Sequence, residues 1–407
     1  MRKVFPMWQL KKAYYRSFQK IMKYAMFIFD WSEPELLEGP GAVKRLPALV
    51  KSKGINKVLV VTDKGLMGLN LLNGLFEALT EAGVDYVVFD GVQPNPTIDN
   101  IEDARALYLE NGCEGVVAFG GGSPMDCAKA AAARVTNPKT SVRKMRGTLR
   151  VFHKPAIIFA VPTTAGTGSE TTVAAVVSDP TTHEKNPIND PKLRPKYAVL
   201  DPELTLGLPP HITSTTGMDA LTHAVEAYIG KSNVRSTEAY AEKAVKLIFG
   251  NLEKVYANGK DLEARGNMLK ASYYAGMAFT RAYVGYVHAI GHNLGGMYGI
   301  PHGLAMSVIL PYVLDYYGKT AWFRLARLAE ISGVCTVGSD EAKAKAFIQE
   351  LRDMNARMNI PDGFDQIKEE DLPTLVKRAL KEANPLYPVP KIMNEADCEA
   401  VIRQLMK

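Results

Sequence analysis

The segment GVVAFGGGSPMDCAKAAAARV, residues 115–135, predicts how the first half of the chain folds. It opens with a short apolar run of the kind that forms a strand buried on both faces of a parallel sheet. Glycines 120–122 end this run, and an alanine-rich stretch typical of a helix follows. Ser123 suits the position that caps a helix, and Pro124 suits the first helical position. The glycines let a phosphate approach the free N–H groups of the helix start, although a tight turn without a ligand explains the same pattern.

Apolar runs of similar length recur on both sides of this segment, with helical periodicity between them. We expect strands at 57–62, 85–90, 115–120 and 156–162, completed by 171–178 and 197–200. Strands that alternate with helices predict a mostly parallel sheet covered on both faces. Such a sheet binds its ligands at the carboxyl ends of the strands.

Beyond about residue 202 the periodicity is helical throughout, which predicts a separate all-α region. The expected organisation is an N-terminal extension (1–29), an α/β domain (30–203) and a helical domain (204–407).

The composition excludes several classes of protein. The chain has 407 residues, of which 47% are hydrophobic and 23% charged, as in ordinary globular proteins. The formal net charge is +6, but seven basic residues and no acidic one lie in 1–29, so the rest of the chain is close to neutral. A neutral body argues against a nucleic-acid-binding protein. No apolar stretch is long enough for a transmembrane helix, and the four cysteines form no CxxC pair, so we expect reduced thiols in a cytoplasmic protein.

The basic N-terminal extension also has helical periodicity. Its apolar stripe consists of Leu10, Tyr14, Phe18, Ile21, Ala25 and Ile28. The stripe fits a helix that packs on its own body or on a neighbouring subunit; a targeting segment, a scaffold contact or contact with an anionic membrane is the alternative. We expect catalysis not to require residues 1–29, and their role to lie in association.

Two more features lie where strands end. The segment PTTAGTGSE (162–170) is rich in glycine and small hydroxyls and follows a strand, so its backbone is open to a ligand at the same sheet edge as the glycine turn. Asp63 follows the first strand of the alternating region, where a carboxylate can bind the ribose hydroxyls of NAD and repel the 2′-phosphate of NADP. A solvated aspartate is the alternative, and the neighbouring Lys64 weakens the preference for NAD.

Four of the seven histidines fall in two patches. Asp219 and His223 are spaced i,i+4 on a predicted helix, as are His288 and His292, so each pair shares a helix face. Gly295, Gly296, Gly299 and Pro301 predict a break that folds His302 back toward His288. Asp219, His223, His288 and His302 then form one carboxylate and three imidazoles, which is a transition-metal set with open positions. For each histidine alone, a hydrogen-bonded core residue is the alternative.

With these residues in place, the chain resembles the iron-containing (group III) alcohol dehydrogenase family over roughly residues 30–407. The resemblance rests on VTDKGL (61–66), QPNPT (93–97), GGGSPMD (120–126), PTTAGTGSE (162–170), LDPELT (200–205), GMDALTHAVEAYI (217–229), HAIGH (288–292) and PHG (301–303). It implies a homo-oligomer of two-domain subunits with dehydroquinate synthase-like architecture and an active site in the cleft. The implied metal ligands are Asp219, His223, His288 and His302, holding Fe2+, with Zn2+ as the alternative. The implied contacts to NAD, or alternatively NADP, are Asp63, Asn95, Gly121, Gly122, Ser123, Asp126, Thr163, Thr164, Thr167 and Lys185.

The resemblance also implies an activity, the interconversion of a primary alcohol and its aldehyde by hydride transfer to and from the nicotinamide. His292 is the expected proton relay, or alternatively a group that orients a ligand. Phe279, Arg281 and Val284 are expected to line the substrate pocket, if the segment before His288 is helical. Arg281 either binds a polar or anionic substrate tail or points to solvent. The competing functions are a zinc-dependent polyol or hydroxy-acid dehydrogenase of the same fold and a non-enzymatic nucleotide sensor.

Overall fold

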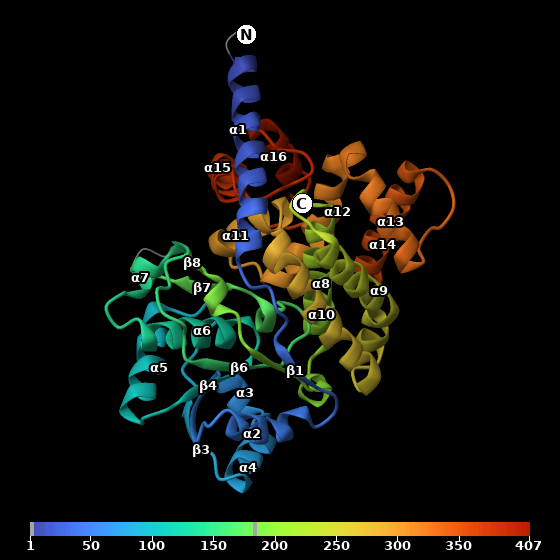
Figure 1. Cartoon of the computed structure of the whole chain (residues 1–407). Coiled ribbons are helices and arrows are strands. Elements are labelled where there is room, and N and C mark those ends of the chain that lie inside the picture. Colours follow the sequence, from blue (N-terminus) through green and yellow to red (C-terminus); the bar gives the residue numbers. More distant parts are fainter. Residues whose placement is uncertain (1–3, 182–184) are drawn as a thin grey trace. The chain divides into compact units, whose positions relative to one another are not determined.

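A parallel sheet organises one of the two units into which the contacts divide the chain, shown in the computed structural model of Figure 1. The structure describes residues 4–181 and 185–407. The α/β unit contains residues 30–208 and 260–276, and the helical unit contains 1–29, 209–259 and 277–407. One boundary between the two units thus lies between residues 208 and 209, beside the Pro209-Pro210 break. The division into 1–29, 30–203 and 204–407 that the sequence suggests stays a prediction.

The six strands of the main sheet are all parallel, as expected. Their order is β1 (Glu35–Glu38), β9 (Tyr197–Leu200), β6 (Ile157–Pro162), β4 (Gly115–Gly120), β2 (Lys57–Val61) and β3 (Asp85–Phe89). A smaller sheet has the order β5 (Gly147–Thr148), β8 (Lys185–Asn189) and β7 (Ala174–Ser178). The strands expected in the first half of the chain are therefore confirmed, with the segment after residue 171 in the smaller sheet.

Helices cover both faces of the main sheet. They are α2 (Ala42–Ser52), α3 (Lys64–Gly68), α4 (Asn73–Glu81), α5 (Ile98–Glu110), α6 (Gly122–Thr136) and α7 (Val142–Met145). Successive strand residues alternate between two buried clusters: Val116 and Ala118 pack in the cluster of α5 and α6, whereas Val117 and Phe119 pack in the cluster of α2 and α4. This alternation explains the continuous apolar run of β4, because a strand buried on both faces has no solvent side.

The C-terminal half is helical, as the periodicity predicts. Its helices are α8 (Pro210–Ile229), α9 (Arg235–Ala257), α10 (Leu262–Ala282), α11 (Tyr286–Tyr298), α12 (His302–Tyr317), α13 (Trp322–Ser332), α14 (Asp340–Arg357), α15 (Leu372–Ala383) and α16 (Glu395–Arg403). The 3-10 turns of the chain are Met26–Ile28, Ser169–Thr171, Pro191–Leu193, Pro202–Thr205, Gly318–Thr320 and Glu369–Asp371. Helix α8 is buried along residues 217–229 and packs against α9 and α12.

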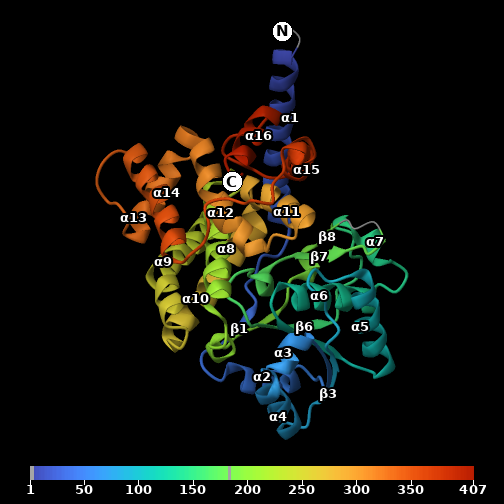
Figure 2. The same ribbon diagram turned by 180° about the vertical axis from the view of Figure 1, so that it is seen from behind.

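The N-terminal helix α1 (Val4–Ala25) belongs to the helical unit and lies beside α15 and α16 in both views of the chain (Figures 1 and 2). The predicted apolar stripe is on its outer face, because Leu10, Tyr14 and Ile21 are all more than half exposed. Across residues 4–181 and 185–407, none of the helices combines the length and the apolar character that crossing a membrane demands.

Candidate active site

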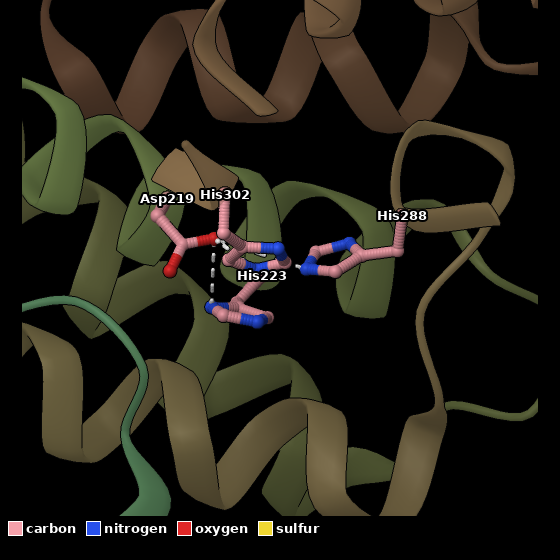
Figure 3. A group of neighbouring side chains, drawn as sticks. All are labelled: Asp219, His223, His288 and His302. Carbon is pink, nitrogen blue, oxygen red and sulfur yellow. Dashed lines mark ion pairs between the residues drawn. The ribbon is translucent and has the colours of Figure 1, made fainter. Parts of the chain in front are cut away.

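Four side chains of the helical unit converge as the histidine pattern predicts. Asp219 and His223 come from α8, His288 comes from α11, and His302 is the first residue of α12 (Figure 3). One potential ligand atom from each of the four lies within 4.8 Å of the others.

Local backbone geometry explains how His302 reaches the other three. Gly299 ends α11 in the left-handed region with a φ of 69° and allows the chain to turn back. A Cβ at Gly303 would lie 2.6 Å from the carbonyl oxygen of Thr215, so only glycine lets the start of α12 approach α8 this closely. The expected fold-back is therefore confirmed.

The geometry of the cluster fits a metal ion. The Asp219 Oδ1 atom lies 3.4 Å from His302 Nε2 and 3.8 Å from both His223 Nδ1 and His288 Nε2. Among the described residues, Asp219 Oδ1, His223 Nδ1 and His288 Nε2 are buried and have no hydrogen-bond partner. A buried polar atom without a partner costs about 1–3 kcal/mol, and an ion bound between these atoms removes that cost.

The electrostatics also favour a cation. Burial lowers the pKa of His223 to about 3 and holds the pKa of His288 well below its ordinary value, so both rings are neutral near pH 7 and offer lone pairs. Burial opposes ionisation of Asp219, yet the neighbouring His223 and His302 leave the pKa of this carboxyl below its ordinary value. The cluster thus offers an anionic carboxylate and the neutral rings of His223 and His288 beside the third imidazole, a combination of ligands that transition metals accept.

Two glutamates that the sequence analysis did not single out hold histidines in place. The buried Glu226 Oε2 lies 2.6 Å from His288 Nδ1, while its Oε1 accepts from the backbone N–H of Val287 at 2.9 Å. Glu382 Oε1 lies 2.6 Å from His292 Nδ1. A carboxylate on Nδ1 fixes the tautomer and turns Nε2 toward the site.

His292 lies next to the cluster without belonging to the four-residue set. It follows His288 by one turn of α11, and its ring stacks on that of His302 with the centroids 5.2 Å apart. The structure therefore brings together the expected relay residue and the expected ligands.

The segment expected to line the substrate pocket departs from the prediction. Phe279 stacks on His223, with the ring centroids 4.1 Å apart and the planes at 14°. The condition of that prediction, a continuous helix from residue 279 to His288, is not met, because α10 ends at Ala282 and α11 begins at Tyr286. Tyr283 has a φ of 67°, which a helix does not tolerate. The spacing argument for Arg281 and Val284 therefore fails, and Arg281 places its guanidinium 4.6 Å from the centre of the Phe27 ring.

In the α/β unit, the expected cofactor residues gather at the carboxyl ends of β4 and β6. The backbone N–H of Thr163 donates to Gly120 O, and that of Asn95 donates to Ser123 Oγ. The side chains of Thr164 and Thr167 lie close to Gly121 and Gly122, within 3.5 Å of where a Cβ would stand. The two loops and the helix start thus meet at one sheet edge.

Three details of this edge differ from or refine the expectation. Ser123 does not cap α6 and Pro124 is not its first residue, because the helix begins at Gly122 with Gly121 in the cap position. Asp63 caps α3 by accepting from the N–H of Leu66. Asp126 accepts from Ser169 Oγ at 3.0 Å and from the N–H of Val176 at 2.9 Å, so it binds the 162–170 loop to α6. Its direct contact with a dinucleotide stays a prediction, and so does that of Lys185, which begins β8 and whose side chain lies outside the described part of the structure.

Comparisons with known proteins agree with this architecture. Residues 34–202 match the family model described as iron-containing alcohol dehydrogenase, and residues 213–406 match the C-terminal model of the Fe-containing alcohol dehydrogenase family. The chain is 39% identical to the 1,3-propanediol dehydrogenase of Citrobacter freundii, over 94% of this chain and 100% of the relative. It is 38% identical to the NAD-dependent methanol dehydrogenase of Bacillus methanolicus, over 86% of this chain and 92% of that relative. The solved structure of an alcohol dehydrogenase from Oenococcus oeni superposes with a TM-score of 0.89 at 34% identity, covering 93% of this chain and 100% of that one.

Proposed function

Because the chain belongs to the iron-containing alcohol dehydrogenase family, we propose that it interconverts a small primary alcohol and its aldehyde with NAD as the hydride carrier. The observation that carries this proposal is the convergence of Asp219 with three imidazoles, in which the buried ligand atoms of Asp219, His223 and His288 lack partners. A nucleotide sensor has no need of such a set. The relatives named for 1,3-propanediol, methanol and lactaldehyde support short alcohols, diols and hydroxyaldehydes as the substrate class.

We assign Asp219, His223, His288 and His302 as the ligands of a divalent ion, Fe2+ in this family. Such an ion supplies Lewis acidity, which lowers the pKa of an alcohol hydroxyl and polarises an aldehyde carbonyl. The protein orients the ligands, since Glu226 binds His288 and the i,i+4 spacing on α8 aligns Asp219 with His223.

His292 is proposed to move the proton that the alcohol loses. Its Nδ1 is held by Glu382, and its ring lies against His302. A fixed imidazole next to the site can accept a proton in one direction and return it in the other. Phe279, stacked on His223, is proposed to form an apolar wall that excludes water.

The dinucleotide is proposed to bind at the carboxyl ends of β2, β4 and β6. The N-terminus of α6 can receive the pyrophosphate, and the hydroxyls of Thr163, Thr164 and Thr167 lie at the same edge. Asp63, at the end of β2, is proposed to bind the adenosine ribose and so favour NAD.

The metal assignment is tested with His288→Ala and His302→Ala. Each variant should lose the metal and nearly all turnover while keeping its circular dichroism spectrum, because the set has no spare ligand. His211→Ala, on the first turn of α8, is the control and should keep both. Full metal content in His288→Ala or His302→Ala would show that the assignment is wrong. A panel of short alcohols, diols and hydroxy acids, run in both directions with NAD and NADP, tests the substrate class.

We also propose that the protein is cytoplasmic, because the buried free thiols of Cys113, Cys127 and Cys398 suit a reducing compartment.

The protein is further proposed to be a homo-oligomer in which the outer face of α1 contacts a second copy. Met7, Tyr14 and Ile21 are exposed at the seven-residue spacing with which helices pair, and the exposed Leu10 and Tyr24 follow Met7 and Ile21 by three residues. Because this segment is basic, pairing of two copies should strengthen as salt rises. Native mass at low and high salt tests this, and weaker association at high salt would indicate an acidic partner instead.

A further inference from the structure

The inner face of α1 binds one particular loop. Arg16 donates to the carbonyl oxygens of Val389 and Pro390, at 2.7 and 3.0 Å. Gln19 donates its amide to the carbonyl oxygens of Pro385 and Tyr387, at 3.1 and 2.8 Å. These carbonyls lie in the loop of residues 384–390, which follows α15.

Gln19 is central to this contact. It is 4% exposed, and its own oxygen accepts from Arg16 at 2.9 Å. Losing this amide removes a donor from both carbonyls. Tyr387 O keeps the N–H of Val389 at 2.9 Å, so the cost falls mainly on Pro385 O, and a buried carbonyl left without a donor costs about 1–3 kcal/mol. The contacts from α1 therefore add to the hydrogen bonds that the loop makes itself, from Tyr387 N–H to Ala383 O and from Val389 N–H to Tyr387 O.

The same loop reaches the active site. The hydroxyl of Tyr387 donates to Glu382 Oε1 at 3.1 Å, and the same oxygen lies 2.6 Å from His292 Nδ1. The second oxygen of Glu382 accepts from the side chain of Asn293 at 3.4 Å. Burial, together with the adjacent Glu382, raises the pKa of Tyr387 well above its ordinary value, so the hydroxyl keeps its proton and remains a donor.

We propose that α1 is a positioning element of the active site, in which Gln19 and Arg16 fix the 384–390 loop so that Tyr387 and Glu382 hold His292 in one orientation. The proposal rests on the proposed role of His292. It assigns a catalytic purpose to the N-terminal extension, whose contacts argue against the expectation that turnover does not need it.

The first test replaces Gln19 with methionine, which keeps the volume and removes both donated hydrogen bonds. Gln19→Met should lower kcat about ten-fold, as a misplaced catalytic group does, while the KM for NAD and the bound metal stay at wild-type levels. Lys20→Met, its exposed neighbour, is the matched control and should change none of these. An unchanged kcat for Gln19→Met would overturn the proposal.

The second test asks whether the effect passes through Glu382. In a Glu382→Gln background, where the carboxylate no longer holds His292, Gln19→Met should have little further effect on kcat. A merely structural contribution of Gln19 would instead lower kcat by the same factor in both backgrounds, which would contradict the proposal. If Gln19→Met does not fold, Tyr387→Phe replaces it in this comparison of single and double variants, because it removes the hydrogen bond from the 384–390 loop to Glu382.

A third readout needs neither metal nor turnover. In the metal-free protein, hydrogen exchange of the backbone amides of residues 386, 387 and 389 should accelerate in Gln19→Met and stay unchanged in Lys20→Met. Equal exchange in both variants would refute the loop contact. His292→Ala separates the two proposals: wild-type kcat in that variant would reject the role of His292, whereas loss in His292→Ala with wild-type kcat in Gln19→Met would reject only the role of α1.

Discussion

Glu226 shows how a residue outside the ligand set controls the site. Its carboxylate is buried on α8 and accepts from both His288 and the backbone of Val287. A Cβ at Gly285 would lie 2.7 Å from Glu226 Oε1, so the glycine makes room for this carboxylate. Glu226 thus sets which nitrogen of His288 faces the ion.

We predict that Glu226→Gln weakens metal binding about 10- to 100-fold, in the range observed for groups that orient metal ligands. The amide keeps the size of the side chain but cannot hold His288 as a charged acceptor does. Competition with a chelator, followed by metal analysis, measures the loss. Glu341→Gln, at the exposed start of α14, is the control and should bind metal like the wild type. Equal affinities for the two variants would show that Glu226 is not an orienting group.

Asp63 carries the second residue-scale prediction. Because its side chain also caps α3, replacement by glycine would disturb both the helix and the charge. Asp63→Ser keeps a capping oxygen and removes the charge. We predict that the wild type prefers NAD, and that the ratio of kcat/KM for NADP to that for NAD rises in Asp63→Ser, because the repulsion of the 2′-phosphate is gone. Equal efficiency of the wild type with both dinucleotides would contradict the assignment.

At the same scale, the sequence is a good guide where the chemistry is local. Asp219 and His223 share a helix, and Glu226 follows His223 by three residues, so the i,i+3 rule could have found it. Glu382 is 90 residues from His292 and carries no local signal. Only the packing of α15 against α11 brings the two together.

At the scale of elements, the helix α6 and the 162–170 loop are joined by a buried lysine. Lys129 is fully buried and donates to Ser169 Oγ and Thr172 Oγ1 at 2.8 Å, and to Ala174 O at 3.0 Å. Burial lowers the pKa of Lys129 to about 8 and raises the pKa of the nearby Glu170 to about 7. The conformation of the loop that is proposed to bind the dinucleotide is therefore stabilised by contacts of buried ionisable groups.

A pH dependence of stability follows from Glu170. Its pKa rises from 4.5 to about 7 on folding, so between these values the folded state binds more protons than the unfolded state. The free energy of unfolding contributed by this group is therefore largest below pH 4.5 and is lost as the pH rises toward 7.

We predict that Glu170→Gln removes this decrease in the free energy of unfolding with pH. Urea unfolding of the metal-free wild type and variant from pH 5 to 7 should give a difference that grows with pH in favour of the variant. A difference independent of pH would show that Glu170 does not titrate in this window.

Elements also show where periodicity misleads. The sequence around 280–286 carries apolar and aromatic residues at spacings compatible with a helix, yet the chain leaves the helix at Ala282. The cause is tertiary, because Gly285 must admit the Glu226 carboxylate while Tyr283 adopts a left-handed backbone. A local pattern cannot register a constraint that another helix imposes. By contrast, the apolar strands of the main sheet and the turn at Gly299 were predictable, since each depends on its own residues.

At the scale of the whole molecule, the N-terminal extension has two faces with different purposes. The inner face donates five hydrogen bonds through Arg16, Gln19 and Lys23 to the carbonyls of the 384–390 loop and of Lys231. The outer face exposes Leu10, Tyr14 and Ile21. The alternative in which the extension packs on its own body therefore describes the inner face, and association remains a proposal for the outer one.

Deletion of residues 1–29 separates these faces from each other. We predict that the truncated protein retains its metal but has a lower Tm and a kcat reduced as in Gln19→Met, because the loop that supports Tyr387 and Glu382 loses its donors. A loss of 1 kcal/mol in the free energy of unfolding lowers Tm by roughly 2–4 °C or less in a chain of this size.

The full-length variant Leu10→Ser/Tyr14→Ser/Ile21→Ser is the counterpart of the truncation. It alters only the exposed face, so Tm and kcat should remain at wild-type values while the native mass falls. Calorimetry, steady-state kinetics and native mass on the three proteins distinguish the contributions. If truncation leaves Tm and kcat unchanged, the inner-face contacts do not support the site; if the triple variant loses kcat with its mass unchanged, the outer face serves catalysis rather than assembly.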